Sequence, residues 1–349
     1  MRSALGWISG TLLIVVFGIA SLGGGDSGAL AARGLNTSSP TAGTRGGDAD
    51  PVATTAPQDA PVFSKNPNYK HAWIDVDGVK THYIEAGSGP PFVLIHGALS
   101  WESGEVNYSD VMGPLSKNFR VIAPDIIGSG YTRPRGPQDF TGQAQGEFLV
   151  HFLEAMHLGP MFIGGGSHGG FLTQFVVFER PALIKKLVIS NSLNGTSTNR
   201  PPMTDRDREP LPPQTPQQIR QMLENYYKHK DLVTEERVRL VHDVYQRNYE
   251  YSNAKSKAVA FSVDRYNQNL SYKGKHISAW GGELKIPLLL MWSEPGSRID
   301  WGLEHMKRVP GSEMHILPWS GHHLPTDQSA RWVHIVTDWL LSDPPRPPN

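Results

Sequence analysis

Short apolar runs alternate with helix-like patterns along most of the chain. The segments 92–95 (Phe-Val-Leu-Ile) and 121–123 (Val-Ile-Ala) are apolar at every position, as expected of strands buried on both faces of a parallel sheet. Residues 148–156 repeat apolar side chains at helical spacing. Further strand-like runs lie at 161–163, 187–189, 288–291 and 314–317, and a last helix is expected around 332–340. This order predicts an α/β fold with a mostly parallel sheet flanked by helices.

A hairpin is predicted ahead of these strands. Residues 73–76 and 81–84 are strand-like and flank Asp77-Gly78, a pair typical of tight hairpin turns. The sheet should therefore begin with an antiparallel pair.

Residues 197–284 interrupt the alternation of strands and helices. The segment opens with a proline-rich stretch and continues with helical patterns at 217–228 and 234–249. An all-helical insert between two strands predicts a lid over the strand ends, where open α/β sheets bind ligands. The lid tyrosines at 226, 227, 245, 249 and 251 are expected to line the substrate channel, although such residues are also common in packed helices.

The first 61 residues differ in composition from the rest. Residues 4–22 are largely apolar after a short basic start, and Ala29-Leu30-Ala31 offers a small-x-small cleavage site, so residues 1–32 are predicted to be a signal peptide or membrane anchor. Residues 33–61, rich in Gly, Ser, Thr, Ala and Pro, should form a flexible linker. We expect an exported protein that is secreted, periplasmic or tethered to a membrane by this segment. The remaining boundaries are expected at 62–196 and 285–343 for the core, 197–284 for the lid and 344–349 for a tail.

Charge and cysteine content exclude several classes of function. The chain has 349 residues, with 33 Lys+Arg and 33 Asp+Glu, and therefore no net formal charge. Nucleic-acid binding is not expected, because contacts with phosphates need a strongly basic face. Cysteine is absent, which excludes disulfides, thiolate metal ligands and cysteine nucleophiles.

A glycine-rich motif marks the candidate nucleophile. Gly165-Gly166-Ser167-His168-Gly169 follows a predicted strand and precedes a predicted helix, which is the G-x-S-x-G pattern in strand–turn–helix context. Only small neighbours tolerate so sharp a turn, and the helix N-terminus favours a developing oxyanion. A phosphate-binding loop is not expected, because no Lys-Ser/Thr follows and the Rossmann spacing is missing.

An oxyanion hole and a general base complete the candidate site. The backbone N–H groups of Ala98 and His168 are the candidate oxyanion donors. Ala98 follows the turn His96-Gly97, in which His96 could instead only satisfy loop carbonyls. A base should lie late in the chain, after the last strand, where His322 is the better candidate and His323 the alternative.

The acid that orients the histidine is less clear from the sequence. It should follow the strand 288–291, where Glu294 lies closest and Asp300 lies further along. Either could be an ordinary loop charge, and Asn191 could orient the ring through its amide oxygen. Asp125, ahead of two glycines, is interpreted as fixing a turn. No metal site and no cofactor are expected, because no clustered ligand spacing occurs.

These motifs, in this order, resemble the α/β-hydrolase superfamily over about residues 70–341. The segments from His96-Gly97 to Asp125 and from Thr215 to Glu236 look like the branch of meta-cleavage-product hydrolases and epoxide-hydrolase-like proteins. The resemblance implies an eight-stranded sheet with a helical lid. It also implies Ser167 as nucleophile, His322 as base, and Ala98 and His168 as oxyanion donors.

The expected function is therefore a serine hydrolase of carboxylic esters, with hydrolysis of an activated C–C bond also possible. A serine at the elbow argues against epoxide or haloalkane chemistry, which in that family uses an aspartate. The chain departs from the family at the acid. The family's Gly-x-x-Asp motif corresponds to residues 293–296 of this chain, where a glycine stands in place of the expected aspartate. Residues 169–174, 190–192 and 196–197 also look similar to maspardin-like proteins, a shorter resemblance that leaves an alternative: a catalytically weak or inactive binding protein on the same fold.

Overall fold

The computed structural model describes residues 66–192, 214–260, 271–272, 275–276, 286–295 and 297–343. The predicted signal or anchor segment 1–32, the linker 33–61, the tail 344–349 and parts of the insert 197–284 lie outside these residues. Within the described ranges, no helix combines the length and the apolar character needed to cross a membrane.

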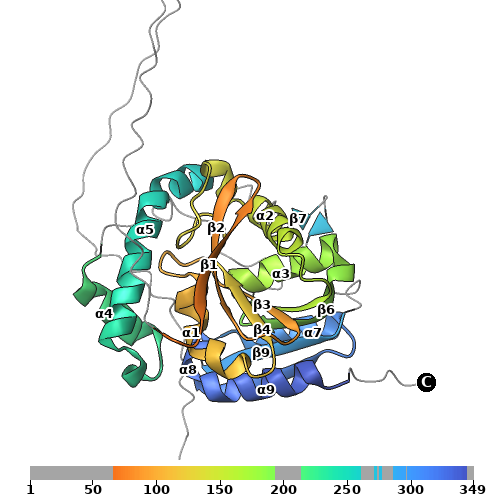
Figure 1. Ribbon diagram of the computed structural model, residues 1–349. Helices are drawn as coiled ribbons and strands as arrows, with labels where there is room; N and C mark the ends of the chain where they lie inside the picture. Colours follow the sequence, from red (N-terminus) through yellow and green to blue (C-terminus); the bar gives the residue numbers. More distant parts are fainter. Residues whose placement is uncertain are drawn as a thin grey trace, which may run out of the picture. The chain divides into compact units, whose positions relative to one another are not determined.

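Eight strands form one twisted sheet in the order β1-β2-β4-β3-β5-β6-β9-β10 (Figure 1). The strands β1 and β2 are antiparallel, as are β2 and β4, whereas every later neighbouring pair is parallel. Their bounds are β1 (Lys70–Val76), β2 (Val79–Ala86), β3 (Pro91–Ile95), β4 (Arg120–Pro124), β5 (Met161–Gly166), β6 (Ile184–Ser190), β9 (Leu288–Pro295) and β10 (Glu313–Ser320). The predicted mostly parallel sheet is confirmed. The hairpin is confirmed as well, since Asp77 and Gly78 both adopt the positive φ of a tight primed turn.

Helices cover both faces of this sheet, so successive residues of a strand enter different cores. Phe92 and Leu94 of β3 pack in the core that includes α1 and α9, whereas Val93 and Ile95 pack in the core with α2 and α3. Figure 1 shows α2 and α3 on one side and α9 on the other. The helices are α1 (Gly104–Leu115), η1 (Pro137–Phe140), α2 (Gly142–Ala155), α3 (His168–Glu179), η2 (Pro181–Leu183), α7 (Ile299–Arg308), α8 (Leu324–Asp327) and α9 (Ser329–Leu341).

The described part of the insert between β6 and β9 is mainly helical. It contains α4 (Pro216–Tyr226), η4 (Lys230–Leu232) and the long α5 (Glu235–Ala260), which lie together at one side of the sheet in Figure 1. The insert is not all-helical as predicted, because β7 (Ser271–Tyr272) and β8 (Lys275–His276) form a short antiparallel pair. The sequence places Gly274 between them, and glycine favours tight hairpin turns.

The insert packs on the loop that follows β3. Ile219, Leu223 and Val241 share a third core with Trp101 and Val106. A partly buried ion pair adds to this contact, since Arg237 Nη2 of α5 donates to both carboxylate oxygens of Asp110 in α1, at 2.7 and 2.8 Å. The helices α4 and α5 therefore pack against the loop at the carboxyl end of β3 and against α1.

Candidate active site

The turn between β5 and α3 holds Ser167 in a strained backbone conformation. Its φ is 53° and its ψ −121°, although residues other than glycine avoid positive φ. The Ser167 N–H donates to Ser190 O at 3.0 Å, and Ser192 Oγ donates to Ser167 O at 2.6 Å. These bonds come from the end of β6 and the residues after it, and they hold the sharp turn that the sequence predicts, with Ser167 partly exposed.

Two glycines lie where the backbone of this turn meets its neighbours most closely. A Cβ atom on Gly165 would lie 2.4 Å from Gly169 C, and one on Gly169 would lie 2.0 Å from Ile95 O. Because a carbon atom does not approach another carbon or an oxygen so closely without a bond, both positions require glycine. The absence of these two side chains lets α3 begin directly against the end of β3.

Buried polar contacts hold the loop that follows β3. His96 is fully buried, with Nδ1 donating to Gly97 O at 2.7 Å and Nε2 accepting from Ile126 N at 2.9 Å. Burial lowers the pKa of His96, and a ring with one donated and one accepted bond is neutral. His96 therefore satisfies backbone groups of the loop, which is the alternative that the sequence left open.

A buried carboxylate, Glu102, supports the same loop. Its Oε2 accepts from Leu99 N at 2.6 Å, and its Oε1 accepts from Asn107 Nδ2 at 2.9 Å. A Cβ atom on Gly97 would lie 2.4 Å from Glu102 Oε2, so the loop passes directly over the carboxylate. The predicted oxyanion donor Ala98 lies between these two contacts. Sequence reasoning missed Glu102, because a single acid in a loop carries no periodic signal.

The side chain of His168 is held by α2. Its Nε2 lies 2.7 Å from Gln145 Oε1, and its ring stacks on Phe171. The predicted role of His168 concerns only its backbone N–H, in the first turn of α3, where the helix dipole is positive.

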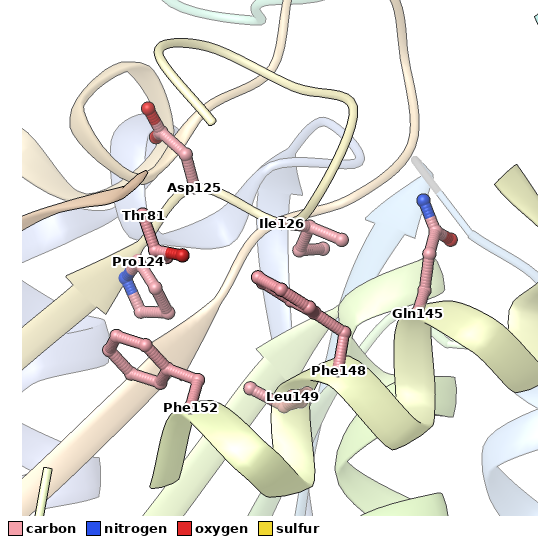
Figure 2. A pocket seen from close by; sticks show the side chains of 8 residues that line it. All are labelled: Thr81, Pro124, Asp125, Ile126, Gln145, Phe148, Leu149 and Phe152. Carbon is pink, nitrogen blue, oxygen red and sulfur yellow. The ribbon is translucent and has the colours of Figure 1, made fainter. Parts of the chain in front are cut away.

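Gln145 also lines a small pocket, which Figure 2 shows. The other lining residues are Thr81, Pro124, Asp125, Ile126, Phe148, Leu149 and Phe152. Its walls are mostly apolar and include neither Ser167 nor His322, so it is not a candidate substrate site.

Asp125 has the structural role that the sequence predicts. Its carboxylate accepts from the N–H groups of Gly104 and Tyr131, each at 2.8 Å, and lies 2.8 Å from His82 Nδ1. Burial opposes ionisation, yet His82 and these contacts hold the pKa of Asp125 below its usual value. The two glycines that follow, Gly128 and Gly130, adopt the positive φ expected of the turn.

The tandem histidines after β10 have different surroundings. His323 is buried, with Nδ1 2.8 Å from Thr326 Oγ1, and burial lowers its pKa to about 3. His322 is partly buried, which lowers its pKa to about 4, and its Nδ1 lies 3.4 Å from Ser297 Oγ. These contacts favour His322 as the base, because His323 is engaged with Thr326.

Neither predicted carboxylate contacts His322. Glu294 is exposed at the end of β9, and exposed Asp300 binds Arg298, with 2.8 Å between Oδ1 and Nε. The hydrogen bond to Arg298 lowers the pKa of Asp300. The last two residues of β9, 294 and 295, are exposed, and the side chain that contacts His322 Nδ1 is that of Ser297.

Residues 190–192 join the two halves of the candidate site. Ser190 and Ser192 bond to the backbone of Ser167, while Asn191 Nδ2 donates to His322 O at 2.7 Å. Asn191 Oδ1 also accepts from Ser293 N at 3.0 Å, so its amide holds the loop rather than the ring. The backbones of Ser167 and His322 are therefore both bonded to one three-residue segment, which follows the carboxyl end of β6.

Tyr226 of α4 brings the insert to this site. Its ring meets that of Trp101 at a centroid distance of 4.9 Å and that of His322 at 6.4 Å, both edge-to-face. Its hydroxyl is buried without a hydrogen bond among the described residues, and burial raises its pKa well above 10. Two other predicted channel tyrosines, Tyr227 and Tyr245, lie in the third core instead.

Asp327 fixes the histidine loop relative to α4. Its Oδ2 accepts from Gly321 N at 2.8 Å, directly before His322, and its Oδ1 accepts from Lys228 N at 2.9 Å. Among the residues that the structure describes, no cluster of three or more potential metal ligands occurs.

Comparisons with known proteins identify the family of this fold. The family described as "alpha/beta hydrolase fold" matches residues 90–324. A 2-hydroxy-6-oxo-2,4-heptadienoate hydrolase of Pseudomonas putida is 24% identical over 271 residues, covering 76% of this chain and 94% of that protein. Haloalkane dehalogenase 2 of Mycobacterium tuberculosis is 30% identical over 128 residues, 36% of this chain and 42% of its own length.

A solved structure gives the same fold over a similar span. The meta-cleavage product hydrolase of Pseudomonas fluorescens superimposes with a TM-score of 0.64 at 20% identity, covering 77% of this chain and 97% of that one. The sheet and its helices thus follow a known architecture.

Proposed function

Because the chain belongs to the α/β hydrolase fold family, we propose that it is a serine hydrolase of carboxylic esters, with Ser167 as nucleophile and His322 as base. The observation that carries this proposal is the segment 190–192, which bonds to the strained Ser167 turn on one side and to the His322 backbone on the other. The His322 Nδ1 faces Ser297, so Nε2 is the ring nitrogen that would have to take the proton of the serine.

In the proposed reaction the Ser167 hydroxyl attacks the ester carbonyl while His322 Nε2 takes its proton. The backbone N–H groups of Ala98 and His168 would stabilise the tetrahedral oxyanion, each contributing about 3 kcal/mol. The protonated imidazole then gives its proton to the leaving alcohol, which departs and leaves an acyl group on Ser167. Water, deprotonated by the same ring, releases the acid and restores the serine.

A second candidate is hydrolysis of a C–C bond beside an activated ketone. The relative from Pseudomonas putida, which matches over most of both chains, is named as a hydrolase of 2-hydroxy-6-oxo-2,4-heptadienoate, a substrate that contains a ketone. The same Ser167 and His322 would serve in that reaction. A carbon leaving group needs a proton at carbon, so a protonated His322 would again be the donor.

Labelling with a fluorophosphonate tests the proposed nucleophile. The wild-type chain is expected to become labelled on the peptide that contains Ser167, as located by mass spectrometry, whereas Ser167→Ala should not be labelled. The matched control is Ser88→Ala, in an exposed turn at the opposite end of β3, which should be labelled like the wild type. Equal labelling of wild type and Ser167→Ala would refute the assignment.

Turnover distinguishes the candidate reactions. Release of p-nitrophenol from short-chain esters reports ester hydrolysis, and loss of the absorbance of a 2-hydroxy-6-oxo-dienoate reports C–C hydrolysis. If the folded protein shows neither activity and no label, the binding-protein alternative replaces both proposals.

Removing the two nearby carboxylates should have little effect. Glu294→Gln and Asp300→Asn are each expected to keep kcat within about twofold of wild type, because both side chains are exposed and neither touches His322. The measurement is kcat for a p-nitrophenyl ester. A tenfold loss in either variant would instead identify the missing acid of the triad.

A further inference from the structure

We propose that Ser297 is a positioning residue for the same reaction: its hydroxyl donates to His322 Nδ1 and thereby keeps the ring proton on Nε2 in the resting protein. The kinetic part of this inference rests on the proposed function. The position of the ring proton does not, because it is a property of the resting protein that can be measured without turnover.

The argument begins at Asn191, where the direction of each hydrogen bond is fixed. Its Oδ1 must accept, because its partner is the backbone N–H of Ser293, and its Nδ2 must donate, because one partner is the carbonyl oxygen of His322. The same Nδ2 donates to Ser293 Oγ at 3.0 Å. The Asn191 amide therefore donates a hydrogen bond to Ser293 Oγ and cannot accept one from it.

Two hydroxyls carry this direction onward to the histidine. Ser293 Oγ is fully buried and donates to Ser297 Oγ at 3.2 Å. Ser297 then accepts from Ser293, and its own proton can be donated to His322 Nδ1, 3.4 Å away. With all three donors in the series Asn191, Ser293 and Ser297 directed toward the ring, Nδ1 presents a lone pair to Ser297.

A carboxylate beside His322 Nδ1 would have the opposite effect on the position of the ring proton. An ionised carboxylate only accepts, so it holds the proton on Nδ1 and leaves Nε2 free to take the proton of the nucleophile. A hydroxyl that donates to Nδ1 favours the other tautomer. In a serine protease, replacing the orienting carboxylate by an amide holds the histidine in the wrong tautomer and lowers kcat by about 10⁴-fold. The consequence here is that catalysis must proceed from the minor tautomer of His322, and turnover is restrained.

The surroundings of His322 agree with a ring that lacks a charged partner. Burial is the cause of its low pKa, and no carboxylate contact raises it again. The groups that face the ring are the neutral hydroxyl of Ser297 and the edge of Tyr226, whose phenol stays protonated. Next along the chain, His323 is itself held by Thr326.

Ser297→Asp tests the inference by reversing the direction of the last hydrogen bond. An aspartate oxygen lies one bond farther from the backbone than a serine oxygen, so it can close the 3.4 Å separation. We expect the ring proton to move to Nδ1 and kcat to rise by about 10- to 100-fold. The added charge should raise the pKa of His322 by about 1–3 units. Because the base must be neutral, the acid limb of kcat/KM should move from near pH 4 to higher pH in this variant.

The proton position is measured by long-range ¹H–¹⁵N NMR of the full chain labelled in its histidines. The His322 signals are identified by their loss in His322→Ala. Wild type and Ser297→Thr, which keeps the hydroxyl, should carry the proton on Nε2, and Ser297→Ala should shift the population toward Nδ1. The charge control is Ser88→Asp, which adds the same charge in an exposed turn and should leave proton and pH profile unchanged.

A wild-type ring with its proton on Nδ1 would overturn the inference, as would a Ser297→Asp variant that folds and loses activity. A purely structural role for Ser297 predicts that both Ala and Asp lower kcat. If the NMR result is as expected but no variant shows turnover or labelling, the inference about the tautomer stands and the proposed function fails.

Discussion

Replacing His322 with alanine is expected to lower kcat for p-nitrophenyl esters by about 10³-fold, because a positioned general base contributes about 10²–10⁴-fold to such a step. His322 lies beside residues 190–192, which also hold the Ser167 turn, and its Nδ1 is turned to Ser297. Without the ring, no group takes the proton of the serine hydroxyl. The loss should appear in kcat with little change in KM, since the ring acts in the transition state.

Two histidine variants show whether this loss is specific. His334→Ala, on the exposed face of α9, should keep full activity. His323→Gln removes the contact with Thr326. Its main effect should be a lower midpoint of thermal unfolding, and its loss in kcat should be small. If His323→Gln instead abolishes turnover while His322→Ala retains it, the base has been assigned to the wrong member of the pair.

Replacing Gly169 with alanine is expected to destabilise the fold by at least about 3 kcal/mol, at the upper end of the range for overpacked positions. The new Cβ would lie 2.0 Å from Ile95 O and 2.6 Å from His96 O, and both are backbone atoms at the end of a central strand. They cannot move without breaking the pairing of β3 with β5. Helix propensity alone predicts the opposite result, since alanine is favoured over glycine inside a helix by about 1 kcal/mol.

Gly166→Ala, three residues earlier in the same turn, is the matched control for this prediction. Its Cβ would meet only Ser190 O, at 3.7 Å, which is ordinary van der Waals contact. We expect its free energy of unfolding to stay within about 0.5 kcal/mol of wild type. Urea unfolding followed by circular dichroism measures both variants. Equal stability of Gly169→Ala and wild type would mean that α3 does not lie as close to β3 as the structure has it.

Much of the fold was predictable because buried strands and amphipathic helices leave periodic patterns. The run at 92–95 predicts a strand buried on both faces, and its residues do alternate between the two cores of the sheet. The pair Asp77-Gly78 predicts its turn, since few other residues accept two positive φ angles. The short pair β7 and β8 was missed, because two-residue strands are too brief to show a period.

The candidate site was predictable only in part, for a related reason. The elbow around Ser167 is local, and its glycines are required by contacts within a few residues and with one neighbouring strand. The surroundings of His322 are not local: Asn191, Ser293 and Ser297 come from the ends of two strands separated by the whole insert. Serine and asparagine are common in loops, so nothing in their order indicates that they replace a carboxylate. Glu294 and Asp300 looked suitable because nearness along the chain suggested nearness in space.

By itself the sequence determined the order of the strands in the main sheet, the helices between them and the sharp turn at Ser167, because each depends on short-range patterns or on chain order. Only the tertiary structure decided which side chain faces the histidine ring, which tyrosine of the insert reaches it, and which acid supports the loop after β3. Those contacts depend on where separate loops converge at the carboxyl edge of the sheet, and no periodicity along the chain encodes that convergence.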